Sequence, residues 1–227
     1  MPPTPRPRTS SAKGIETRER IVDVAVRFIA RNGARGTSLS DIATEACVSQ
    51  TGLLYHFGSK EALLNAVLDR HVAFTEQWLW GDGPDPGLGI VWIIARHMAN
   101  WPSHPQDDSV YNLIGLNTVV LAENVGKVTD LHPRLVEGYR TTIDRVAATL
   151  RNAQKRGEIR DDVDPRLKAM EIIGFCYGLE AAWLVSPTIP VADAAAQWAA
   201  HQTALLAPES AASGPRSSAS RPPSTPS

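Results

Sequence analysis

The sequence predicts an all-helical protein in which a small N-terminal head precedes a larger helical body. Apolar residues recur at intervals of three and four along most of the chain, and no segment alternates apolar and polar residues as a strand does. Ser, Asp, Gly and Pro stand where these helices are expected to begin or end. With 227 residues, 43% of them hydrophobic, the chain can bury a substantial core.

The first expected helix begins at Thr17 and ends at Asn32-Gly33. Its apolar positions lie on one stripe that faces a core: Ile21, Val24, Ala25, Phe28 and Ile29. The preceding residues 1–14 are rich in proline and basic side chains and are expected to form a disordered arm. This arm could add contacts with phosphates or the minor groove, or it could be a solvated tail without a function.

Residues 37–64 predict two short helices and the start of a third. The three helices have expected N-terminal caps at Ser38, Ser49 and Ser59, and Gly58 ends the second. This is the spacing of a helix-turn-helix, in which the second helix lies in the major groove of DNA. The sequence therefore predicts a DNA-binding head at residues 15–62.

Polar side chains on and around the second short helix are the candidates for DNA contact. Gln50 and Thr51 are expected to meet base edges, because Gln can bond adenine at two places and Thr offers a hydroxyl and a methyl group. The other candidates, of which all but Ser38 are expected to meet phosphates, are Ser38, Ser49, Tyr55, His56 and Lys60. His56 could instead pack against the first helix.

These segments resemble the N-terminal domain of the TetR family of bacterial transcription regulators. The resemblance rests on the helix that begins near Thr17, the Ile42-Ala43 pair and the segments VSQTGLLYHF and SKEALL, within about residues 15–65. It implies that Tyr55, His56 and Lys60 meet the DNA backbone.

Two residues depart from the pattern of that family. Cys47 stands in the turn where many members have a glycine, so it is expected to adopt a positive φ angle. Leu54 stands where a tyrosine is frequent, so one contact with DNA is expected to be missing.

The formal net charge of −1 hides an asymmetry between the two ends of the chain. Residues 1–60 hold nine Lys and Arg and five Asp and Glu, which gives +4, so the remaining 14 basic and 19 acidic residues give −5. A basic head on an acidic body favours contact with phosphates at one end only.

The body is expected at residues 63–207, joined to the head by a helix that runs from Lys60 to Trp78. A glycine-rich connector at 81–89 follows that helix. Further helices are expected around residues 88–95, 113–121, 135–150, 165–185 and 191–206. Residues 208–227 are rich in Ser, Pro and Ala and are expected to form a disordered tail.

The segment 166–185 is apolar nearly all round, whereas a surface helix needs only one apolar stripe. One face is expected in the chain's own core and the other against a second copy, because the resemblance implies an interface of four helices between two chains. The candidate interface residues are Ile172, Cys176, Leu179, Trp183, Trp198 and Leu205. Alternatively, the last two helices complete a monomeric core.

A ligand pocket, which the resemblance also implies, is expected in the body. All six tryptophans lie outside the head, and Asn117 is a neutral polar residue on an otherwise apolar stripe. Pockets for small molecules are apolar with a few placed polar groups. The candidate pocket residues are Trp92, Asn117 and Phe175, although aromatic residues at helical spacing can equally be ordinary core.

No motif in the sequence indicates an enzyme or a metal site. HExxH, CxxC and GxSxG are absent, and the six histidines are scattered without ligand spacing, so no cofactor is expected. The two cysteines and the absence of an N-terminal apolar stretch predict a cytoplasmic protein. No apolar run approaches the ~20 residues that a membrane span requires.

The resemblance implies a sequence-specific transcriptional regulator that binds double-stranded DNA with inverted half-sites as a homodimer. It is expected to act as a repressor until a small apolar or aromatic ligand releases it from the operator. The alternative is a helical dimer that binds a small molecule but whose head no longer binds DNA, because of Cys47 and Leu54.

Overall fold

The computed structural model describes residues 12–103, 109–126, 129 and 131–208, so most of the predicted arm and tail lies outside the described residues. These residues form nine α-helices and two 3₁₀ turns and no strand, which confirms the all-α prediction. The helices are α1 (Ala12–Gly36), α2 (Leu39–Glu45), α3 (Gln50–Phe57), α4 (Lys60–Leu79), α5 (Ile90–Asn100), α6 (Ser109–Asn124), α7 (His132–Lys155), α8 (Pro165–Val185) and α9 (Val191–Leu206).

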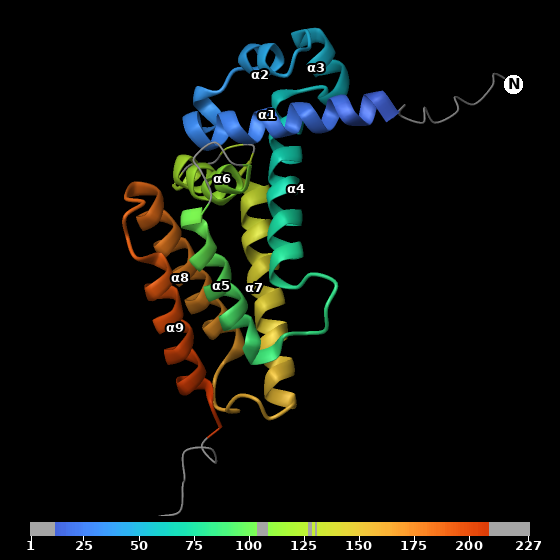
Figure 1. The fold of residues 1–227 in the computed structure, drawn as a ribbon. Helices are drawn as coiled ribbons and strands as arrows, with labels where there is room; N and C mark the ends of the chain where they lie inside the picture. Colours follow the sequence, from blue (N-terminus) through green and yellow to red (C-terminus); the bar gives the residue numbers. More distant parts are fainter. Residues whose placement is uncertain (1–11, 104–108, 127–128, 130, 209–227) are drawn as a thin grey trace, which may run out of the picture.

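Head and body are stacked along one axis (Figure 1). α1 lies across the end of the molecule with α2 and α3 on its outer side, while α4 runs from the head down into the body. α5, α7, α8 and α9 form the rest of the bundle, and α6 lies directly beneath α1. α4 and α6 are therefore the elements that join the head to the body.

The predicted capping residues start the helices of the head. The Oγ atoms of Ser38, Ser49 and Ser59 accept backbone N–H groups of the first turns of α2, α3 and α4 at 3.1, 3.0 and 3.1 Å. Gly58 ends α3 with a φ angle of 78°. Each cap satisfies a donor that the helix itself leaves unpaired, so these boundaries follow from local chemistry.

The structure adjusts two local expectations and confirms a third. α1 begins at Ala12, so residues 12–14 of the predicted arm are helical. α1 also extends to Gly36, although Gly33 interrupts the helix with a φ of 74° and a ψ of 166°. Cys47 has a φ of 52°, as expected, and is the one non-glycine residue with a positive φ in the described part of the chain. Such a conformation costs about 1 kcal/mol in a residue that has a Cβ.

The apolar core of the head contains residues of α6. The stripe of α1, exemplified by Ile21 and Ile29, packs together with Ile42, Leu53 and Phe57 of the helix-turn-helix. The same cluster includes residues from α4 and α6, namely Leu63, Val67, Leu113, Leu116 and Val120. The head therefore does not close its core by itself, because α6, which belongs to the predicted body, completes it.

Two residues predicted for a dimer interface lie inside the core of a single chain. Ile172 is 0% exposed and Trp183 is 2% exposed, both within the cluster formed by α5, α7, α8 and α9. A side chain that is already enclosed cannot meet a second copy, so the prediction is wrong for these two. α8 has apolar residues on several faces, and the sequence pattern does not show which face its own chain covers.

The junction between α1 and α6 supplies a test of the fold. A Cβ atom on Gly33 would overlap the carboxylate of Glu123 in α6, and the positive φ angle is unfavourable for any other residue. We expect Gly33→Ala to lower the free energy of unfolding by about 1–3 kcal/mol in urea titrations at one protein concentration. The control is Gly36→Ala, whose Cβ would make only an ordinary contact at 3.5 Å. Equal stability of the two variants would contradict this account of the junction.

Candidate DNA-binding surface and ligand pocket

α3 turns one apolar side into the head and a polar side outward. Leu53 and Phe57 are buried, whereas Gln50 and Thr51 are exposed. Tyr55 lies four residues after Thr51 and is 73% exposed. A tyrosine with most of its surface in water contributes little to the core, so its ring and hydroxyl are accessible to an external partner.

The other predicted contact residues lie around this helix at the outer end of the molecule. Ser38 and Ser49 are exposed caps, and the His56 ring meets Tyr55 edge to face with centroids 5.7 Å apart. Lys60 Nζ donates to the carbonyl oxygen of Thr37 at 2.6 Å. An ammonium group has three N–H donors, so two remain for an external acceptor. All seven predicted residues therefore lie in or beside α2, α3 and the first turn of α4.

Arginines of α1 hold this unit together, a role that the sequence pattern did not indicate. Arg20 Nε donates to the carbonyl oxygen of Ala46 at 3.0 Å, at the turn between α2 and α3. The Arg18 guanidinium lies over the ring of Phe57, 4.9 Å from its centroid. Both contacts join residues far apart in the sequence, and they fix the position of α3 relative to α1.

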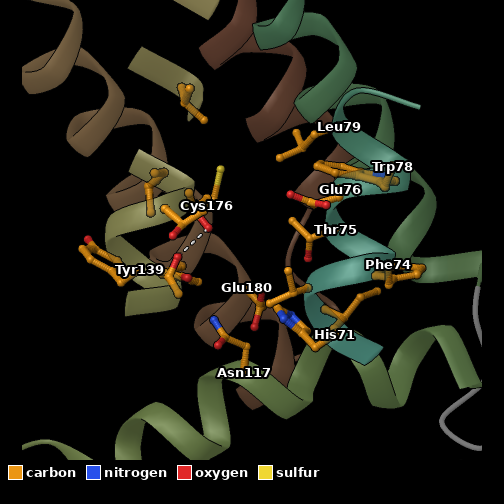
Figure 2. A pocket seen from close by; sticks show the side chains of 18 of the residues that line it. His71, Phe74, Thr75, Glu76, Trp78, Leu79, Asn117, Tyr139, Cys176 and Glu180 are labelled. Atoms are coloured by element: carbon orange, nitrogen blue, oxygen red, sulfur yellow. Dashed lines mark hydrogen bonds between the residues drawn. The ribbon is translucent and has the colours of Figure 1, made fainter. Parts of the chain in front are cut away.

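The body contains a cavity of about 200 Å³ between α4, α5, α6, α7 and α8. Its walls are mainly apolar and aromatic, and Figure 2 shows side chains from several of these helices pointing into it. The aromatic wall residues are Phe74, Trp78, Trp80, Trp101, Tyr139 and Tyr177. A cavity with this lining can hold a small apolar or aromatic molecule.

Buried polar groups are concentrated at the end of the cavity nearest α6. His71, Asn117 and Glu180 converge there from α4, α6 and α8 (Figure 2). Glu180 is 9% exposed and accepts a hydrogen bond from the hydroxyl of Thr118. The Asn117 Nδ2 atom is buried without a hydrogen bond. Polar groups in such positions lower stability unless they are satisfied, so they indicate a binding site.

Burial shifts the proton affinities of these groups in opposite directions. It raises the pKa of the Glu180 carboxyl from its ordinary 4.5 to about 8, because the charged form loses its hydration. It lowers the pKa of His71 from 6.5 to about 4 for the same reason. Near neutral pH both groups are therefore mostly uncharged in the empty cavity.

The mouth of the cavity carries charges that are already paired. Arg145 pairs with Glu76, and its guanidinium lies 4.2 Å from the centroid of the Trp80 ring. Arg134 pairs with Asp69 at 2.5 Å. Within the described residues, no group of three His, Cys, Asp or Glu side chains could hold a metal ion. The helices of that same part of the chain are also too short or too polar to cross a membrane.

Comparison with known proteins agrees with this arrangement. Residues 21–67 match the family model described as bacterial regulatory proteins, tetR family. Residues 21–67 therefore form a TetR-family DNA-binding domain. The match covers α2, α3 and the parts of α1 and α4 that pack against them, and the chain is a DNA-binding transcriptional regulator.

Relatives over most of the length share this assignment. The HTH-type transcriptional regulator SrpR of Pseudomonas putida is 25% identical over 174 residues, which are 76% of this chain and 77% of SrpR. The HTH-type transcriptional repressor NicS of Pseudomonas putida is 27% identical over 168 residues, 71% of this chain and 74% of NicS. The structure of a SmeT–triclosan complex shows the same fold, with a TM-score of 0.68 and 22% identity over 83% of this chain and 90% of that chain.

Of the three predicted pocket residues, the structure places only Asn117 at the cavity. Trp92 is 47% exposed on the far side of α5, where its Nε1 donates to Thr203 Oγ1 at 3.0 Å. Phe175 stacks on Trp198 with ring centroids 4.5 Å apart, away from the cavity. Helical spacing shows that such residues share a face of a helix, but it does not show which face lines the cavity.

Glu180 and His71 were not predicted from the sequence. Glu180 is an acid within an otherwise apolar segment of α8, from Ile172 to Val185, and the criterion that selected Asn117 would have selected it too. His71 had no comparable signal, because a histidine on a long helix is ordinary and only the tertiary structure places it at the cavity.

The raised pKa of Glu180 gives a test of its burial. Its folded-state value lies above its unfolded-state value, so the folded protein binds more protons and loses stability as pH rises from about 4.5 to about 8. We expect Glu180→Gln to match the parent within about 1 kcal/mol at pH 5 but to be more stable by roughly 2–4 kcal/mol at pH 8. Urea titrations at both pH values measure this. A difference that does not change with pH would show that Glu180 titrates as an exposed acid.

Proposed function

We propose that this regulator is a homodimeric repressor that a small molecule, bound in the cavity of the body, releases from its operator. The observation that carries the proposal is the combination, in one chain, of an exposed polar face on α3 with a lined cavity that shares α4 and α6 with the head. The name of NicS as a repressor and the triclosan complex of SmeT support both halves of the proposal.

In the head, we assign base-edge contacts to Gln50 and Thr51 and phosphate contacts to the residues around them. Gln50 and Thr51 lie in the first turn of α3, where a helix that enters the major groove meets the bases. The flanking set comprises Ser38, Ser49, Tyr55, His56 and Lys60. The caps of α2 and α3 are intact despite the positive φ of Cys47, which favours a functional head over a degenerate one.

The dimer is assigned to the outer faces of α8 and α9. Leu167 and Val185 on α8 are 65% and 87% exposed, and Met170 and Leu205 are also exposed. Between them α8 carries Gly174 and Gly178, where an added Cβ would meet no atom within 4 Å. A second copy could approach closely over such a strip. Of the other predicted interface residues, Leu179 and Trp198 are partly buried, whereas Cys176 lines the cavity and is not assigned to the interface.

Two elements can carry a change in the cavity to the head. α4 begins with Lys60 in the head and carries His71, Phe74 and Trp78 into the cavity wall. α6 carries Asn117 at the cavity, and nearly two turns later its Glu123 accepts a hydrogen bond from the backbone N–H of Ala34 at 2.7 Å. A ligand that moves either helix would change the separation of the two heads and so their match to two half-sites.

DNA binding is tested with the duplex that flanks the protein's own coding region. We expect a discrete complex in fluorescence anisotropy that persists at higher salt, while an unrelated duplex is released. Gln50→Ala or Thr51→Ala should weaken binding to the specific site by about 1–3 kcal/mol and relax its sequence preference. Lys60→Ala should weaken binding to both duplexes alike. It should also reduce the slope of log affinity against log salt concentration by about 1.

The control for these head variants is Lys155→Ala, which removes an exposed charge at the far end of α7. No specific complex with any tested duplex, or Gln50→Ala and Thr51→Ala variants that bind like the parent, would favour the alternative of a dimer whose head no longer reads DNA.

Dimer formation has its own test. Gly178→Glu places a charged side chain on the strip of α8 where a single chain leaves open space, so folding of that chain should be unaffected. We expect sedimentation equilibrium to show at least a tenfold weaker dimer, since a buried unpaired charge costs more than ~1.4 kcal/mol. Gln77→Glu, which adds the same charge to an exposed position of α4, is the control. An unchanged dimer would place the interface elsewhere.

A further inference from the structure

The polar end of the cavity contains an acid without a basic partner. Glu180 accepts hydrogen bonding from Thr118 alone, and among the described residues no Lys, Arg or His pairs with it. The walls of the same cavity hold two acids, Glu76 and Glu180. Glu76 is paired with Arg145, whose guanidinium lies over Trp80, so the cavity mouth shows a complete arrangement of carboxylate, aromatic ring and cation.

The interior repeats this arrangement without the cation. Glu180 lies at the end of a cavity whose walls are formed by the rings of Phe74, Trp78, Trp101 and Tyr139. The faces of such rings attract cations, most strongly where water is excluded. A cation beside Glu180 would gain both the ion pair and the contacts with the rings.

The neighbours of Glu180 can accept the hydrogen bonds of an ammonium group. An uncharged His71 has one ring nitrogen free to accept, whereas an imidazolium has none. The Asn117 amide is buried with Nδ2 unbonded, and a half-turn of this amide would place its oxygen toward the cavity instead. A primary ammonium has three N–H donors, which matches the three groups at this end.

We propose that the ligand is an amphipathic primary amine, with its protonated nitrogen on Glu180, His71 and Asn117 and an aromatic or apolar body against the rings of the cavity. This inference rests on the proposed ligand-binding function and specifies the chemical class of the ligand. Asn117 and Thr118 lie on α6, so a cation that draws Glu180 toward itself acts directly on the helix that completes the core of the head.

Binding of such a cation is coupled to proton release. In the empty cavity the raised pKa of Glu180, about 8, keeps the carboxyl mostly protonated at pH 7, and the bound ammonium requires the carboxylate. Nearly one proton should therefore leave the protein on binding at pH 7. The other titratable groups around the cavity include His71, which stays neutral in this range, and Cys176 and Tyr177, whose pKa values are raised to about 12. Arg145 pairs with Glu76, Arg134 pairs with Asp69, and the His97 ring lies against Trp78. Loss of proton release in the Glu180→Gln variant therefore separates the proton of Glu180 from that of any other group.

The experiment uses three probes with the same two-ring body: 1-naphthylmethylamine, 1-naphthalenemethanol and 1-naphthoate. Isothermal titration calorimetry of the full chain, in two buffers of different ionisation enthalpy at pH 7, measures affinity and proton release together. We expect the amine to bind at least tenfold more tightly than the alcohol or the carboxylate. Its affinity should rise about tenfold between pH 6 and 7 and level off above pH 8.

Glu180→Gln tests the assignment of the residue. It should lower the affinity for the amine at least tenfold, abolish proton release and leave the affinity for the alcohol within about threefold. Glu137→Gln, an exposed acid on α7 paired with Arg140, is the matched control and should behave as the parent. Circular dichroism confirms that both variants are folded. Tighter binding of the alcohol or the carboxylate, or amine binding without proton release, would overturn the inference.

Measuring affinity for the specific DNA duplex with and without each probe distinguishes failure of this inference from failure of the proposed function. If the amine binds as expected but leaves DNA affinity unchanged, the ligand class stands and release by ligand fails. If the alcohol or the carboxylate binds more tightly and releases the DNA, the repressor mechanism stands and the ligand class is wrong.

Discussion

The packing of α6 beneath α1 is the contact on which the rest of the molecule depends. Leu116 and Val120 of α6 are buried in the core of the head, and Glu123 holds the backbone at Ala34. Without α6 the apolar stripe of α1 would face water over part of its length. The same helix carries Asn117 to the cavity, so the interaction that stabilises the head also makes its position sensitive to the contents of the body.

The cavity lowers the stability of the folded chain. It leaves an Asn117 donor unbonded, a carboxyl that can ionise only at raised pH and a volume of about 200 Å³ that side chains do not fill. Each of these features lowers stability relative to a packed core. A ligand that supplies the missing contacts recovers this free energy, and part of it becomes available to shift α4 and α6 between two arrangements.

The DNA-binding surface is built in the opposite way, from satisfied local interactions. Serine caps fix the starts of α2, α3 and α4, and Arg18 and Arg20 hold α3 against α1. The side chains at the surface contribute little to the stability of the head. Tyr55 is mostly exposed, and Gln50 and Thr51 point away from the core. A rigid frame with exposed polar side chains suits recognition of a rigid partner such as a DNA duplex.

The sequence by itself determined the all-α class, the caps and ends of most helices and the position of the helix-turn-helix. These follow from interactions between residues a few positions apart, so the pattern of residues carries them. Only the tertiary structure decided which face of each helix is covered. It buried Ile172 and Trp183 within one chain, turned Trp92 and Phe175 away from the cavity, and brought His71 to Glu180 from helices about a hundred residues apart. Burial depends on long-range packing, and periodicity shows only that residues share a face.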